Sequence, residues 1–165
     1  MDINALDKNY AVRPLVDADI PALLALCQDN PQYYQYCPPE PSEASLRADM
    51  RALPPGKGLD DKYYLGFFDG AELVAVMDLI LRYPNPHTAF IGFFMMNASR
   101  QGSGLGTAII TDVLAHLSGE FSAVRLAYVQ GNEQSKHFWH KNGFGPTGVI
   151  AHGELYDMVV MEREI

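Results

Sequence analysis

The residues best suited to chemistry form a glycine-rich run, Gln101-Gly102-Ser103-Gly104-Leu105-Gly106-Thr107. An apolar stretch of strand type precedes this run, and apolar residues at helical spacing follow it. A loop between a strand and a helix start presents unpaired backbone N–H groups at the positive end of the helix dipole. Glycine also lets a phosphate approach the main chain, because it has no Cβ atom. The pattern therefore predicts a site for a phosphate-bearing ligand.

The spacing of the glycines separates this loop from two common phosphate-binding loops. It reads Gly-x-Gly-x-Gly, and so lacks the Gly-x-Gly-x-x-Gly of a dinucleotide-binding fold. No Lys-Ser or Lys-Thr pair follows it, as a P-loop for nucleoside triphosphates requires. A nucleotide-binding protein of another fold is therefore the weaker interpretation.

Asp78 is a second candidate, because it is the only charged residue in the apolar run LVAVMDLIL. A carboxylate in a buried strand must be paired or functional. If the turn after this strand is symmetric, Asp78 pairs near Gly92 and lies about 7 Å from Phe94 across the sheet. We interpret Asp78 as a general base. The alternatives are a solvent-facing position or an ion pair with Arg82 or Arg125.

Three tyrosines, Tyr33, Tyr34 and Tyr36, lie in the proline-rich segment DNPQYYQYCPPEP, which predicts a loop. Tyrosine offers rigid apolar area with a polar tip, which suits the wall of a substrate pocket. The alternative is that the tyrosines only pack this loop onto the domain.

The elements that must position these residues follow from the hydrophobic pattern. Asp17 is placed to cap a first helix that begins at Ala18, and Ser42, with Ser45 three residues on, to cap a second. Asp69-Gly70 predicts a hairpin. The expected strands are 10–16, 63–68, 72–81, 88–96, 123–129, 149–152 and 155–161, and two further helices cover 105–117 and 132–142.

Two motifs together resemble the GNAT superfamily of N-acetyltransferases, which bind acetyl-CoA. The first is Gln-x-x-Gly-x-Gly, at Gln101, Gly104 and Gly106. The second is Asn-x-x-Ser-x-x-Phe-aromatic-x-x-x-Gly-Phe, which runs from Asn132 to Phe144. The resemblance implies a single α+β domain over residues 1–165. Its fold would be a splayed, mostly antiparallel seven-stranded sheet with about four flanking helices, open between the fourth and fifth strands.

The resemblance also implies where acetyl-CoA binds. The pyrophosphate would lie on the amides of Gly102 to Thr107, and the pantetheine arm along the strand edge near Phe94. The amide of Phe94 would polarise the thioester carbonyl, and Tyr33, Tyr34 and Tyr36 would form a wall of the acceptor site. The implied cofactor-binding residues are Phe94, Met95, Met96, Gln101, Gly102, Ser103, Gly104, Leu105, Gly106, Thr107, Asn132, Ser135 and Trp139.

Trp139 departs from the family pattern, because many members have a tyrosine there that protonates the CoA thiolate. An indole N–H donates a hydrogen bond but cannot serve as an acid at neutral pH. Ser135, a nearby tyrosine or water would then supply the proton, or no proton donor is needed. A non-catalytic sensor that only binds acetyl-CoA is the alternative function.

The resulting prediction is an N-acetyltransferase that uses direct attack by a primary amine, since neither Cys27 nor Cys37 falls near the motifs. His137 and His140 lack companions at ligand spacing, so no metal is expected. The 20 acidic residues exceed the 12 basic ones, and no basic cluster suits a nucleic acid. With no apolar run long enough for a membrane helix, we expect a cytoplasmic protein. A homodimer stays an open alternative.

Overall fold

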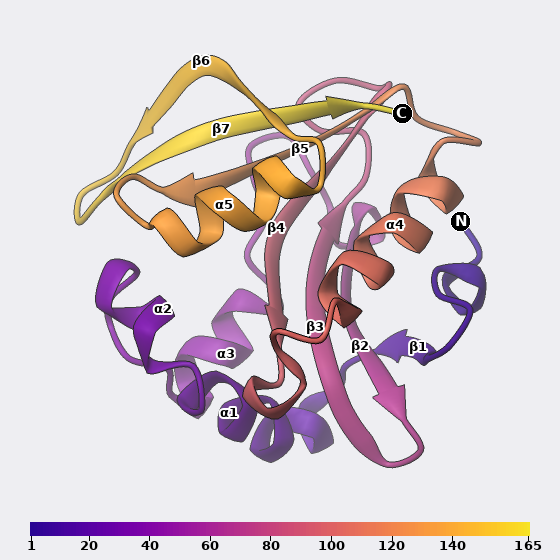
Figure 1. Ribbon diagram of the computed structural model, residues 1–165, viewed down its shortest axis with the longest axis vertical. Coiled ribbons are helices and arrows are strands. Elements are labelled where there is room, and N and C mark those ends of the chain that lie inside the picture. Colours follow the sequence, from indigo (N-terminus) through magenta and orange to yellow (C-terminus); the bar gives the residue numbers. More distant parts are fainter.

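Apolar strands form a seven-stranded sheet at the centre of the protein, in the order β1-β2-β3-β4-β5-β7-β6 (Figure 1). The computed structural model describes residues 1–165. The strands are β1 (Ala11–Pro14), β2 (Lys62–Asp69), β3 (Glu72–Ile80), β4 (Thr88–Met96), β5 (Ala123–Val129), β6 (Gly145–His152) and β7 (Asp157–Glu164). The helices are α1 (Ile20–Gln28), α2 (Pro31–Tyr36), α3 (Glu43–Asp49), α4 (Leu105–Leu117) and α5 (Glu133–Lys141).

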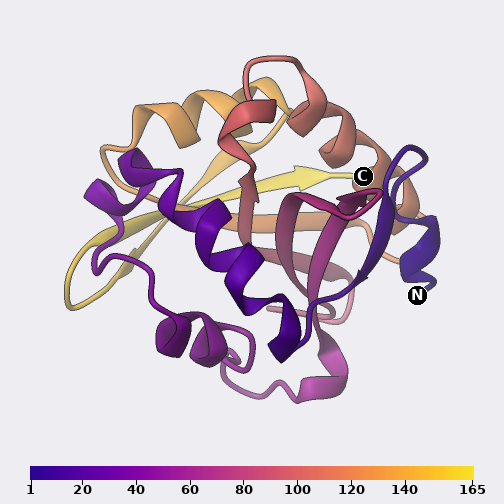
Figure 2. The same cartoon turned by 90° about the horizontal axis from the view of Figure 1, so that it is seen from below.

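Helices cover both faces of the sheet, with α1, α2 and α3 on one face and α4 and α5 on the other (Figures 1 and 2). The predicted stripe of α4 is buried in one core, through Ile109, Val113 and Leu117. The stripe of α1 is buried in a second core, through Ile20 and Leu23. No helix is long and apolar enough to span a membrane. The amphipathic pattern therefore correctly identified the buried faces of both helices.

The sheet opens between β4 and β5, as the resemblance implied. These two strands are the only parallel neighbours, and they pair only from Thr88–Ala123 to Ile91–Leu126. Beyond Ile91, β4 continues to Met96 without a strand on its β5 side. The last residues of β4 therefore have a free edge on that side, at the centre of the molecule.

A bulge in β4 changes the expected register beside Asp78. Leu79 pairs with Ile91, but Asp78 pairs with Phe93, so Gly92 is the extra residue. Phe93 is thus the direct partner of Asp78, and the prediction that Asp78 pairs near Gly92 is confirmed. Gly92 and Asp78 also touch, because a Cβ atom at Gly92 would lie 2.7 Å from Asp78 Oδ2. A side chain at position 92 would therefore have to displace the Asp78 carboxylate.

Two predictions about the helices were wrong. The tyrosine-rich segment expected to be a loop contains α2, which starts with a proline at its first position, and raises the number of α-helices to five. Asp17 does not cap α1, because residues 17–19 form a 3₁₀ turn and α1 begins at Ile20. The predicted cap Ser42 is confirmed, since its side chain accepts from the amide of Ser45, and Asn132 caps α5 in the same way.

Candidate active site

The glycine loop presents a row of free backbone donors. None of the N–H groups from Gly102 to Thr107 has a hydrogen-bond acceptor within the protein. Gly102 and Gly104 have φ of +75° and +85°, conformations that favour glycine. Because these donors precede and begin the thirteen-residue helix α4, the loop suits a pyrophosphate group. The predicted loop residues are thus placed together at the end of β4.

Gln101 anchors this loop through its side chain. Its amide nitrogen donates to Asn30 Oδ1 at 2.6 Å and to the carbonyl oxygen of Met96 at 3.2 Å. Asn30 in turn donates to the carbonyls of Leu26 and Met96. The side-chain amide of Gln101 therefore makes hydrogen bonds within the protein, and the Met96 carbonyl accepts from both Gln101 and Asn30. Asn30 has no sequence signal and was not predicted.

A cavity of about 190 Å³ lies between the diverging ends of β4 and β5. Phe94 from β4, Ser135 and Trp139 from α5, and Tyr128 from β5 line it. Asn132 is buried at the start of α5 and accepts the amide of Ser135 at 3.1 Å. The Ser135 hydroxyl has no hydrogen-bond partner in the protein. The structure thus brings the second motif against the free edge of β4, and we call this space the donor cavity.

Trp139 closes the donor cavity on its inner side. Its ring packs edge-on against Phe138 at 4.9 Å and Phe144 at 5.3 Å, and it lies 6.1 Å from Phe94. Only 7% of the residue is exposed. The indole N–H makes no hydrogen bond within the protein. Trp139 is therefore part of the core and also forms a wall of the cavity.

We expect Trp139→Phe to keep most of the turnover, because a phenyl ring still walls the cavity and the indole is no acid. Trp139→Ala should lower the free energy of unfolding by about 3–5 kcal/mol, since it empties a packed aromatic site. Urea unfolding and steady-state kinetics measure the two effects. An inactive Trp139→Phe protein that still binds acetyl-CoA would show that the indole N–H takes part in catalysis.

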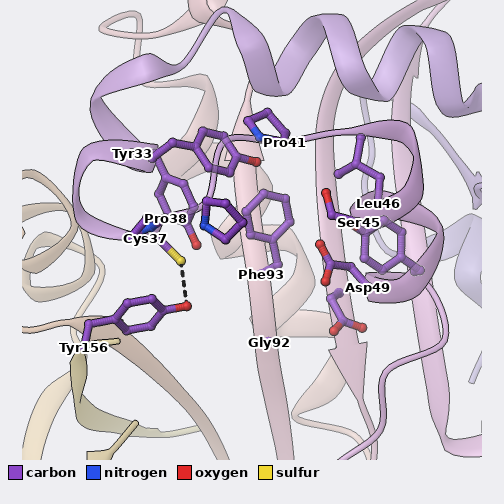
Figure 3. Close-up of a pocket in the computed structure, with 14 residues that line it drawn as sticks. Tyr33, Cys37, Pro38, Pro41, Ser45, Leu46, Asp49, Gly92, Phe93 and Tyr156 are labelled. Atoms are coloured by element: carbon purple, nitrogen blue, oxygen red, sulfur yellow. Dashed lines mark hydrogen bonds between the residues drawn. The ribbon is translucent and has the colours of Figure 1, made fainter. Parts of the chain in front are cut away.

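A second cavity of about 260 Å³ lies on the opposite face of β4 (Figure 3). Tyr33 and Tyr34 line it, together with Tyr64 from β2 and Phe93. Tyr36 lines neither of the two cavities, so the structure does not bring it to the site with the other two tyrosines. We call this space the acceptor cavity.

Asp78 lies in the acceptor cavity and is paired with Lys62, the first residue of β2. Lys62 Nζ is 2.8 Å from Asp78 Oδ2, whereas Asp78 Oδ1 is buried without any hydrogen-bond partner. Burial raises the pKa of Asp78, and the hydrogen bond from Lys62 opposes that shift. The alternative ion pair with Arg82 or Arg125 does not form, because these arginines pair with Glu120 and Glu162. An unpartnered buried carboxylate oxygen is rare, and it marks Asp78 as a candidate functional group.

The two cavities meet at five shared residues, including Gly92 and Phe93 on β4. Tyr156, from the turn between β6 and β7, is another, and its hydroxyl lies 3.1 Å from the Sγ atom of Cys37. Cys37 therefore does lie beside the motifs, contrary to the expectation from the sequence. The hydrogen bond with Cys37, and then desolvation, raise the pKa of Tyr156 to about 12. Tyr156 was not predicted, because nothing in its local sequence marks it.

A family model described as the acetyltransferase (GNAT) family matches residues 23–144. This chain belongs to that family. The loop, the splayed strands and the second motif thus have the places expected for a GNAT acetyltransferase. The resemblance seen in the sequence is confirmed, and so is the fold. No curated protein matches the sequence.

Solved structures share the GNAT fold at low sequence identity. An acetyltransferase from Thermus thermophilus has a TM-score of 0.77 and 19% identity, covering 96% of this chain and 98% of that one. A Salmonella typhimurium acetyl transferase, described as modifying the N-terminal serine of ribosomal protein L7/L12, has a TM-score of 0.74, 19% identity and 97% coverage of each chain. A ribosomal L7/L12 N-acetyltransferase in complex with coenzyme A has a TM-score of 0.71 and 18% identity, covering 97% and 96%.

Proposed function

We propose that this GNAT protein transfers the acetyl group of acetyl-CoA to a primary amine by direct attack. The observation that carries the proposal is the meeting of the donor and acceptor cavities at Gly92 and Phe93. The free edge of β4 lies on one side of this junction, and Asp78, which lines the acceptor cavity, lies on the other. Two reactants entering from opposite faces of the sheet would come together there.

Acetyl-CoA supplies the activated acetyl group as a thioester. The free amides from Gly102 to Thr107 would bind its pyrophosphate, and the open edge of β4 would pair with the amide groups of the pantetheine arm like an added strand. We assign to the backbone N–H of Phe94 the role of stabilising the developing oxyanion. Asn132 and Ser135 would form the opposite wall beside the arm.

The chemical step needs an unprotonated amine. Its nitrogen attacks the carbonyl carbon, so that the C–N bond forms and the C–S bond breaks. The Asp78 carboxylate accepts the amine proton, directly or through water. The CoA thiolate takes a proton from the hydroxyl of Ser135 or Tyr156, since Trp139 cannot supply one. A pKa of about 12 keeps Tyr156 protonated at neutral pH.

Direct attack is preferred over an acetyl-cysteine intermediate, although Cys37 lies at the junction. The Cys37 thiol already donates a hydrogen bond to the Tyr156 oxygen, so attack by its sulfur would first have to break this contact. Kinetics test this point. Direct attack predicts intersecting lines in double-reciprocal plots, and a Cys37→Ser protein that stays active.

The enzyme and the sensor alternatives are separated by thiol release. Mixing the protein with acetyl-CoA and a panel of primary amines should release CoA and yield an acetylated amine, detected by mass spectrometry. Saturable acetyl-CoA binding without thiol release from any amine would contradict the enzyme proposal and favour the sensor. The sensor alternative rests on Trp139, which stands where many family members have a tyrosine that protonates the CoA thiolate.

A further inference from the structure

The acceptor cavity is a small chamber with aromatic walls. Its volume of about 260 Å³ is below the ~300–1,000 Å³ typical of pockets for drug-sized ligands. Tyr33 packs edge-on against Tyr34 at 5.1 Å and against Phe93 at 5.6 Å, and Tyr64 lies on the β2 side. Burial raises the pKa of Tyr33, Tyr34 and Tyr64, so these phenols stay neutral. Neutral aromatic walls of this kind attract cations.

Two carboxylates make this chamber negatively charged. Besides Asp78, the wall includes Asp49, the last residue of α3, which makes no hydrogen bond or ion pair through its side chain. Figure 3 shows Asp49 reaching toward β4 on the side away from Cys37 and Tyr156. No Lys, Arg or His lines the cavity, and the nearby Lys62 forms an ion pair with Asp78. One negative charge is therefore left without a partner.

The chamber is also closed on one side. Cys37 follows α2, and Tyr156 lies in the turn between β6 and β7, and both side chains lie on the same side of β4 (Figure 3). Their 3.1 Å hydrogen bond joins these two segments where the cavities meet. An extended peptide crossing the site on this side would have to break that contact. A compact acceptor would not.

We infer that the acceptor is a compact diamine, with one nitrogen acetylated at the junction and a second, protonated nitrogen held by Asp49. The inference rests on the proposed function, since it names the substrate class of the same site. The reacting nitrogen lies beside Gly92 and passes its proton to Asp78. The second ammonium contacts Asp49 and the neutral tyrosine rings. This substrate class differs from the ribosomal protein acceptors named for two of the structural neighbours.

The test is a binding measurement on the intact protein saturated with CoA, by titration calorimetry. The probes are 1,4-diaminobutane and pentan-1-amine, which have the same number of non-hydrogen atoms but differ in the second nitrogen. We expect the diamine to bind at least about tenfold more tightly, as for one hydrogen bond to a charged group. Asp49→Asn should reduce this difference to about twofold or less. Asp60→Asn, at an exposed position outside the cavity, should leave it unchanged.

Equal binding of the two amines, or no binding of the diamine, overturns the inference. So does an Asp49→Asn protein that keeps the full preference. Thiol release with a free tetrapeptide N-terminus as acceptor gives a second arm, and a kcat/KM equal to that of the diamine also overturns it. Selective diamine binding without any acetyl transfer sustains the diamine site at Asp49 and contradicts the proposed function instead, so the two failures are distinct.

Discussion

Replacing Asp78 with asparagine is expected to lower kcat by about 10²–10⁴-fold, the usual cost of losing a general base. Acetyl-CoA affinity should change little, because Asp78 lines the acceptor cavity and not the donor cavity. The variant is also expected to be less stable by about 3–5 kcal/mol, since Lys62 is left buried without its partner. Loss of activity alone would therefore not distinguish catalysis from folding.

A double variant separates these two effects. Lys62→Met together with Asp78→Asn replaces the ion pair with two neutral side chains, and should recover most of the thermal stability. We expect the double variant to stay as inactive as Asp78→Asn, at a temperature where both are folded. A stable double variant with most of the wild-type activity would assign Asp78 to structure.

The pH dependence of the rate gives an independent check on Asp78. Burial raises its pKa above the usual value, and a general base must be ionised to act. The rate should therefore fall as the pH drops through the raised pKa. Lys62→Met removes the hydrogen bond that opposes the shift, so the acid limb of the profile should move to higher pH. An acid limb unaffected by this change would contradict the role of Asp78.

Gly104→Asp is expected to abolish stabilisation by acetyl-CoA. At a hundredfold excess over Kd, a ligand that binds only the folded state adds ~2.7 kcal/mol. For a chain of this length, that corresponds to about 5–10 °C in Tm. A carboxylate at Gly104 would repel the pyrophosphate from the free amides of the loop. Differential scanning calorimetry with and without acetyl-CoA measures the shift.

Gly56→Asp is the matched control for backbone strain. Both glycines have a positive φ, +78° for Gly56 and +85° for Gly104, and neither has an atom within 4 Å of an added Cβ. The two variants should therefore lose similar stability in the absence of ligand. Only Gly56→Asp should keep the acetyl-CoA shift. If the Gly104→Asp protein kept the full acetyl-CoA shift in Tm, the pyrophosphate could not be assigned to this loop.

The features predicted well from the sequence are those with a local signal. The apolar run before Gln101 and the spacing of apolar residues from Leu105 to Leu117 predicted β4, the loop and α4. Both signals are local, because the period of a strand or a helix is visible in residues close together in the sequence. The Asp69-Gly70 hairpin is confirmed for the same reason, since Gly70 has the positive φ that such a turn requires. The short helix α2 was missed because its six residues are too few to show a period.

The parts of the site that could not be predicted depend on contacts between distant segments. Lys62 reaches Asp78 because β2 places Tyr64 opposite Asp78, and residues two apart on a strand share a face. The bulge at Gly92 then shifts the register of β4, so that Phe93 lies opposite Asp78. Tyr156 comes from a turn near the end of the chain. None of these placements leaves a local pattern in the sequence.

The central claim is that the glycine loop and the open edge of β4 hold acetyl-CoA, with its thioester at the junction of the two cavities. A crystal structure of the protein with CoA tests this most directly. The account predicts the pyrophosphate on the amides of Gly102 to Thr107, the pantetheine arm along β4 beyond Ile91, and the sulfur beside Phe94 and Ser135. A CoA molecule bound with its pyrophosphate away from the loop, or with its sulfur outside the donor cavity, would contradict the account.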